Sequence, residues 1–73
     1  MADIEAKTEV TGAVWKIVTE VGQKIEPGDT IMIIESMKME IPVVSEEGGV
    51  IRKILVEEKT PVSEGQVVAI LSA

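Results

Sequence analysis

The chain has 73 residues, which is enough for one small domain with a thin core. Thirteen acidic residues against seven basic ones give a net charge of −6, which argues against nucleic-acid binding. The sequence contains no cysteine and no histidine, so disulfide bonds, thiolate metal sites and the commonest general base are excluded.

No apolar run approaches the roughly 20 residues that a membrane-spanning helix needs. The first five residues, MADIE, have neither the basic region nor the apolar stretch of a secretory signal. We therefore expect a cytoplasmic protein that does not bind membranes.

The first predicted strand follows Gly12 and covers Val14–Val18. A polar stretch with a short apolar step at Ile25 leads to the turn Glu26–Asp29. Proline followed by glycine at the centre of this turn suits type II, because proline fixes φ and glycine accepts a positive φ. A second strand is expected over Thr30–Glu35.

The next segment, ESMKME, occupies residues 35–40 and precedes a predicted strand over Ile41–Val44. Pairing outward from Met37-Lys38 places Glu35 opposite Glu40, which is the register of a two-residue hairpin. Such a turn prefers Asn-Gly or Asp-Gly, since type I′ requires positive φ at both central residues. The Met-Lys turn and the paired glutamates both go against local preference, and such violations tend to occur at functional sites.

The second half of the chain repeats the first. Residues 12–34 align without a gap on residues 49–71, an offset of 37 (49 − 12). The alignment contains six identities in 23 positions and places Gly12 on Gly49 and Gly28 on Gly65. It predicts strands over Val50–Val56 and Val67–Ser72, joined through an apolar step at Val62 and a turn at residues 63–66.

The short strands, frequent turn signals and lack of a helical period predict an all-β sandwich. Two matched halves indicate pseudo-two-fold symmetry, with each half contributing to both sheets. Under the offset, Met37-Lys38 corresponds to the place where the two chain ends meet. Lys38 is therefore expected at the end of the molecule opposite both termini.

The segment ESMKMEIPVVSEEGGVIRKI resembles the attachment site of biotin carrier proteins, in which the lysine of a Met-Lys-Met triplet carries biotin. The stretches GAVWKIVTEVGQKIEPGDTIMIIES and GQVVAILSA resemble the rest of that family's domain, so the likeness runs from about Gly12 to the end. The pattern is most similar to free-standing biotin/lipoyl attachment proteins.

This resemblance implies a barrel-sandwich hybrid of two four-stranded antiparallel sheets, with residues 1–73 forming one attachment domain. It places biotin covalently on Lys38, with Met37 and Met39 as the flanking recognition residues. Glu35 and Glu40 are candidate contacts for the modifying ligase. No catalytic or metal-binding residues are expected, so the chain would be a non-catalytic carrier within a biotin-dependent carboxylase system.

The implied function is a biotin carboxyl carrier that shuttles a carboxyl group between biotin carboxylase and carboxyltransferase, after modification by biotin protein ligase. One alternative is a lipoyl carrier, or a dual acceptor that lipoate ligase also modifies. Glu35, three residues before the lysine, is shared with the lipoyl pattern, whereas the methionines are not. A further alternative is an unmodified interaction domain whose tip binds a partner directly.

Overall fold

The computed structural model describes residues 3–73, and within this range it contains eight strands and no helix. No segment of the described chain forms a helix of the length and apolarity that crossing a membrane requires. The strands are β1 (Asp3–Lys7), β2 (Gly12–Ile17), β3 (Lys24–Ile25), β4 (Thr30–Ser36), β5 (Met39–Val44), β6 (Gly49–Ile54), β7 (Pro61–Val62) and β8 (Val67–Ser72).

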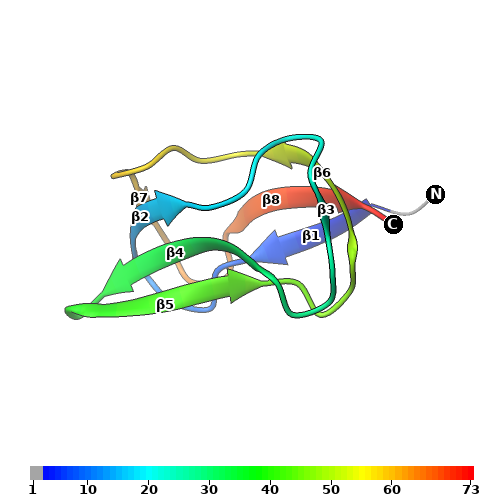
Figure 1. Ribbon diagram of the computed structural model, residues 1–73. Coiled ribbons are helices and arrows are strands. Elements are labelled where there is room, and N and C mark those ends of the chain that lie inside the picture. Colours follow the sequence, from blue (N-terminus) through cyan, green and yellow to red (C-terminus); the bar gives the residue numbers. More distant parts are fainter. Residues whose placement is uncertain (1–2) are drawn as a thin grey trace.

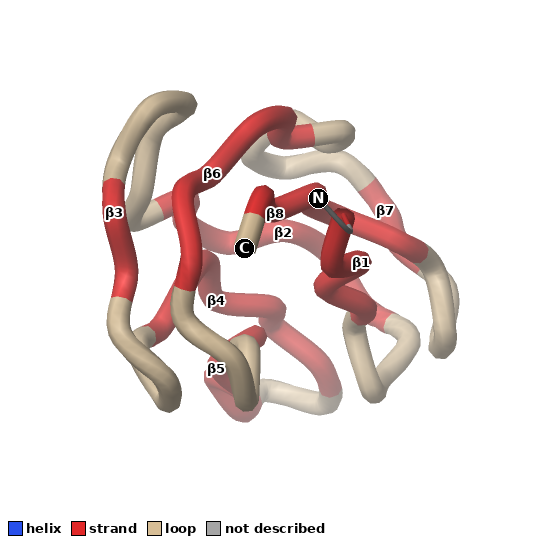
Figure 2. Tube along the Cα trace, turned by 90° about the vertical axis from the view of Figure 1, so that its right-hand side faces the viewer, coloured by secondary structure: helices blue, strands red, loops and turns tan. Residues whose placement is uncertain are grey.

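Two four-stranded antiparallel sheets make up the fold, as predicted. One sheet has the strand order β1-β8-β6-β3 and the other the order β5-β4-β2-β7. Each half of the chain contributes two long strands to one sheet, and one long strand and one two-residue strand to the other (Figure 1). Viewed along the molecule, the strands surround a common centre (Figure 2).

The core between the sheets is aliphatic, because the strands carry β-branched and other aliphatic residues on their inward faces. Burial of these side chains is the main stabilising contribution, at about 25 cal/mol for each Å² of apolar surface removed from water. The buried hydrophobic residues are Ala6, Val14, Ile25, Ile31, Met32, Ile34, Val43, Ile51, Val62, Val68, Ala69 and Leu71.

The offset of 37 seen in the sequence recurs in the structure. Strands β2 and β3 become β6 and β7 when 37 is added to their bounds. The irregularity in the β2–β4 pairing, between Val14 and Lys16, has its counterpart in the β6–β8 pairing between Ile51 and Lys53. Gly28 and Gly65 occupy matching turns with φ of 88° and 84°.

Buried hydroxyl groups repeat in the same way at the start of two loops. The Thr8 hydroxyl donates to the carbonyl of Val10, and the Ser45 hydroxyl donates to the carbonyl of Glu47. The backbone carbonyls of Thr8 and Ser45 accept hydrogen bonds from the turn glycines Gly65 and Gly28. These bonds satisfy polar groups that would be costly to bury unpaired, and they fix each loop against a turn of the other half.

Two strands end earlier than the sequence predicted. The expected strands Val14–Val18 and Val50–Val56 stop at Ile17 and Ile54, and each begins at its preceding glycine. Val18 and Leu55 each keep one backbone hydrogen bond, to Ile31 and Val68, but their side chains are exposed. The predicted strands were too long because Val18 and Leu55 are apolar but exposed, whereas Val56 packs against the core from beyond the end of its strand.

The β4–β5 hairpin and the C-terminus lie at opposite ends of the long axis (Figure 1). The described chain measures 36 × 18 × 17 Å, so the hairpin is one end of an elongated body. The predicted separation of Lys38 from the C-terminus is therefore confirmed. Asp3 pairs with Ser72 next to the C-terminus, whereas Met1, whose position was also predicted, lies outside the described residues.

Candidate functional site

Apolar pairs fix the register of the hairpin that carries Lys38. Met32 pairs with Val43 and Ile34 with Ile41, and three of these four side chains are fully or almost fully buried. A shift of one residue would turn these side chains to the outer face and expose them to water. The register that results places Ser36 opposite Met39 and Glu35 opposite Glu40, as predicted from the sequence.

The turn itself has a left-handed backbone at both central residues. Met37 has φ of 53° and Lys38 has φ of 66°, which is the signature of the type I′ turn expected from the two-residue loop. A left-handed conformation costs about 1–2 kcal/mol for each residue that has a Cβ atom. The hairpin therefore keeps a strained Met-Lys pair where glycine or asparagine would be more stable.

All the side chains around Lys38 point into solvent or are only partly covered. Met37 is 92% exposed and Met39 is 60% exposed, although methionine is usually buried. Ile34 is fully buried and belongs to the last core layer before the tip, so residues 35–40 extend beyond the core. The site presents one lysine between two flexible apolar side chains that can adapt to a protein surface.

Hydrogen bonds hold the base of the hairpin against two neighbouring loops. The Ser36 hydroxyl donates to the carbonyl of Thr11 at 2.8 Å. The Thr11 hydroxyl in turn accepts from the backbone N–H of Glu64 at 3.0 Å. Gly12 lets β2 approach the carbonyl of Glu35 so closely that a Cβ atom would collide with it. The tip is thus short and braced at its base.

Charges near the tip leave the lysine accessible. Glu35 and Glu40 face each other across the β4–β5 pairing, and both are exposed. The two ion pairs found among residues 3–73 join Lys7 with Glu5 and Arg52 with Asp3, so neither involves Lys38. An exposed ammonium without an ion-pair partner in the described chain can be reached by a modifying enzyme.

The structure adds two residues near the site that the sequence did not assign. Trp15 is 46% exposed and lines the same hollow as Glu35. Lys59 lines that hollow and has φ of 69°, a left-handed conformation. The repeat contained the signal for Lys59, because it aligns with Gly22, whose φ of 94° favours glycine.

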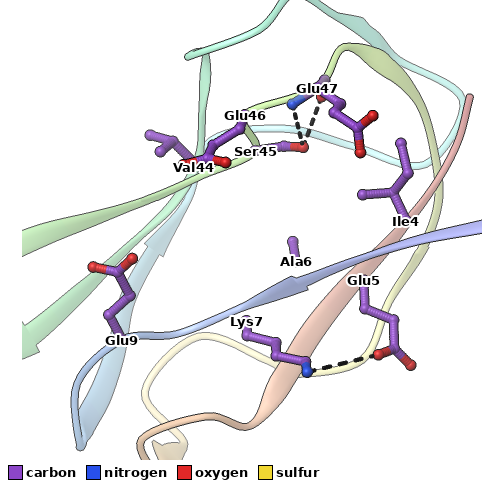
Figure 3. Close-up of a pocket in the computed structure, with 9 residues that line it drawn as sticks. All are labelled: Ile4, Glu5, Ala6, Lys7, Glu9, Val44, Ser45, Glu46 and Glu47. Carbon is purple, nitrogen blue, oxygen red and sulfur yellow. Dashed lines mark hydrogen bonds and ion pairs between the residues drawn. The ribbon is translucent and has the colours of Figure 1, made fainter.

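A second hollow, of about 450 Å³, lies between β1 and the loop after β5, away from the tip (Figure 3). Ile4 and Ala6 face it from β1, and the Ser45 hydroxyl on its opposite wall is bonded within its own loop. Within residues 3–73, no three carboxylates, histidines or cysteines come together as a metal site. This hollow is a gap between two edge strands, β1 and β5.

Comparison with known proteins places the chain among attachment domains. The family model described as "Biotin-requiring enzyme" matches residues 4–71. A biotin/lipoyl attachment protein of Bacillus subtilis is 39% identical over 64 residues, which cover 88% of each chain. A biotinylated protein TB7.3 homolog of Mycobacterium leprae is 32% identical over 68 residues, covering 93% of this chain and 96% of that protein.

Larger proteins contain similar segments. The urea carboxylase of Kluyveromyces lactis contains one that superposes with a TM-score of 0.93 at 36% identity, covering 99% of this chain and 6% of that one. The succinyltransferase component of the 2-oxoglutarate dehydrogenase complex of Staphylococcus saprophyticus, a dihydrolipoyllysine-residue enzyme by name, is 37% identical over 67 residues. That match covers 92% of this chain and 15% of the relative.

Proposed function

The chain belongs to the biotin/lipoyl attachment domain family, and we propose that it is a biotin carboxyl carrier with its cofactor on Lys38. The observation that carries this proposal is the position of Lys38 at the braced apex of a type I′ turn, between two exposed methionines. The left-handed backbone at both turn residues supports the same assignment, since such strain tends to persist at functional sites.

The residues of the tip fit a covalently attached cofactor. An amide between the Lys38 ammonium and the carboxylate of biotin buries no charge, because the lysine is exposed. The modification removes one positive charge and changes the net charge from −6 to −7 (−6 − 1). The flexible part of the attachment is then the Lys38 side chain alone, because the contacts of Ser36 and Gly12 hold the end of β4 in place.

When bound, biotin supplies a ureido nitrogen that accepts a carboxyl group derived from bicarbonate and donates it to an acceptor. The chain itself does no chemistry and acts as a carrier. Its contribution is to hold Lys38 on a rigid end, so that the arm searches a small volume near a docked partner. The methionines offer adaptable apolar contact to more than one enzyme surface in turn.

The partners of such a carrier are biotin protein ligase, a biotin carboxylase and a carboxyltransferase, all acting in the cytoplasm. The urea carboxylase of known structure and the TB7.3 homolog support biotin, because their names state a carboxylase and a biotinylated protein. We further propose that residues 1–73 act as one carrier domain.

A lipoyl carrier is the second candidate, and a specific observation favours it. Glu35 lies three residues before the lysine, exposed on the outer face, and a dihydrolipoyllysine-residue succinyltransferase component is 37% identical to the chain. Met37 and Met39 favour biotin, because the lipoyl pattern places aspartate before the lysine. Acceptance of both groups, with lipoate ligase as the second modifying enzyme, is the intermediate case.

The proposed function is tested with fully biotinylated protein, purified biotin carboxylase, ATP and radiolabelled bicarbonate. We expect label on the wild-type protein and none on a Lys38→Arg control treated in the same way. A parallel sample carrying lipoate is offered to a 2-oxoacid dehydrogenase. Failure of the biotinylated protein to take up label, together with acylation of the lipoylated one, would replace the carboxyl carrier by a lipoyl carrier.

A further inference from the structure

A hollow of about 260 Å³ lies on the outer face of the β5-β4-β2-β7 sheet, beside the hairpin. It is lined by Ala13, Val14, Trp15, Glu35 and Lys59. Ala13 pairs with Glu35 across β2 and β4, and the backbone N–H of Lys59 donates to the carbonyl of Val14 at 2.6 Å. The fold thus brings Trp15, Glu35 and Lys59 to the lining of one hollow near the tip.

The repeat shows that the fold does not require these side chains. Residues 37 positions away occupy the equivalent place at the other end of the molecule, where Arg52 replaces Trp15 and Ser72 replaces Glu35. Arg52 donates to Asp3 at 2.6 Å, so an ion pair covers that face. At the tip, an indole that is 46% exposed stands in the place of the guanidinium.

Lys59, like Trp15 and Glu35, differs in residue type from its counterpart in the other half of the repeat. It has a left-handed backbone with φ of 69°, whereas the equivalent Gly22 adopts φ of 94° without the strain of a Cβ atom. A lysine at this position costs about 1–2 kcal/mol relative to glycine. The structure therefore keeps a lysine with a strained backbone in the same hollow as an exposed tryptophan, at the end that carries Lys38.

The distance from the tip suits an arm attached to Lys38. Glu35 lies three residues before Lys38, which corresponds to about 10 Å along an extended strand. A lysine side chain joined to biotin through an amide extends about 14 Å from Cα to the bicyclic ring, from bonds of about 1.5 Å. The ring can therefore reach the hollow by folding back over the outer face.

We propose that the biotinyl arm on Lys38, which rests on the function proposed above, docks reversibly in this hollow when no partner enzyme holds it. The thioether ring packs on the indole of Trp15, a contact that sulfur and aromatic groups favour. The ureido N–H groups donate to the Glu35 carboxylate, and the ureido carbonyl accepts from Lys59. These groups match the donors and acceptors of the ureido ring, and the indole supplies the apolar wall.

The attachment to the same molecule is what makes such a weak site useful. A short tether gives an effective concentration in the millimolar range, so a contact of millimolar affinity is occupied about half of the time. A partner enzyme then needs to offer only a slightly better site to withdraw the arm. The docked state keeps an apolar ring out of water between encounters.

The experiment uses the fluorescence of Trp15, which is the single tryptophan in a chain without tyrosine. Unmodified protein is compared with protein shown by intact mass to be fully biotinylated, using acrylamide as a quencher. With about half of the arms docked, we expect the quenching constant to fall by about a third to a half on biotinylation. Lys38→Arg carried through the same ligase reaction is the control and should show no change.

Two variants test the assigned contacts. Lys59→Gly introduces the glycine that the other half carries at this position, and Glu35→Ser introduces the serine that the other half carries in place of the glutamate. A double variant combines the two substitutions. Each is compared after purification of its biotinylated form. We expect the protection of Trp15 to be lost in the double variant, while the far-ultraviolet spectrum stays that of the parent.

Equal quenching of the unmodified and fully biotinylated parent overturns the docking proposal and leaves the carrier function standing. Protection that persists in the double variant also overturns it, because the arm then contacts Trp15 without Glu35 and Lys59. Protection that arises only when a carboxylase is added assigns the hollow to that partner and contradicts the resting site. A chain that takes no biotin at all contradicts the proposed function, a result that the mass measurement distinguishes.

Discussion

Met37 shows how an unfavourable residue choice identifies the candidate site. Asparagine or glycine would relieve the left-handed backbone at φ of 53°, yet the chain keeps a methionine that is 92% exposed. Neither feature contributes to the core. We propose that this side chain serves recognition of a partner surface, because most of it lies in solvent.

We predict that the flanking methionines select biotin over lipoate. Both carrier types share a fold and a tip lysine, so a ligase must distinguish them by the tip surface. The double substitution Met37→Asp, Met39→Ala removes apolar contact and adds a charge, a change of about 1–3 kcal/mol in recognition. It should lower the ratio of biotin to lipoate attachment by up to about a hundredfold.

Competitive labelling with purified biotin and lipoate ligases, read by intact mass, measures this ratio. Val44→Thr, an exposed substitution at the far end of β5, is the matched control and should leave the ratio at the parent value. If the double variant gives the same ratio as the parent, recognition depends on another part of the domain.

At the scale of the strands, Gly12 and Gly28 are glycines for different reasons. A Cβ atom on Gly12 would collide with the backbone of Glu35, which no side-chain movement can relieve. Gly28 has open space around it and is needed for its φ of 88°. We predict that Gly12→Ala destabilises the protein by about 3 kcal/mol, and Gly28→Ala by about 1–2 kcal/mol.

Urea denaturation of the two variants and the parent measures these differences. Gly12→Ala should also reduce biotin attachment, because it displaces the strand that leads to Lys38. A Gly28→Ala variant that is less stable than Gly12→Ala would contradict the close approach of β2 and β4.

Most of this arrangement could be predicted from the sequence, because the repeat carries information that a single strand does not. The aligned glycines gave the turns at Gly28 and Gly65, and the outward pairing from Met37-Lys38 gave the hairpin register. The ends of the strands were less predictable. Val18 and Leu55 are apolar but exposed, and no local pattern distinguishes them from core residues.

The hollow beside the tip could not be predicted, because its residues come from three separate segments. Trp15, Glu35 and Lys59 meet only once β2 pairs with β4 and the loop after β6 bonds to Val14. The positive φ of Lys59 was implicit in its alignment with Gly22 but contradicts the preference of lysine. Non-local contact and backbone strain are the two properties that sequence patterns express least directly.

At the scale of the whole molecule, the repeat places equivalent strands at two ends that carry different side chains. One end holds the C-terminus and an ion pair between Arg52 and Asp3, and the other holds Lys38 (Figure 1). The chain contains other lysines, and Lys16 and Lys53 lie at equivalent positions on β2 and β6. We therefore propose that position at the braced tip, and not mere exposure, selects the lysine that is modified.

The most direct test is to incubate the chain with both purified ligases, biotin, lipoate and ATP, and then to map the product. A protease that cleaves after glutamate releases Ser36–Glu40, in which Lys38 is the single lysine. The assignment of Lys38 as the biotin attachment site predicts biotin on this peptide alone, no adduct on peptides that contain Lys16 or Lys53, and no product from Lys38→Arg. Biotin on any other lysine, or lipoate as the main adduct on Lys38, would contradict it.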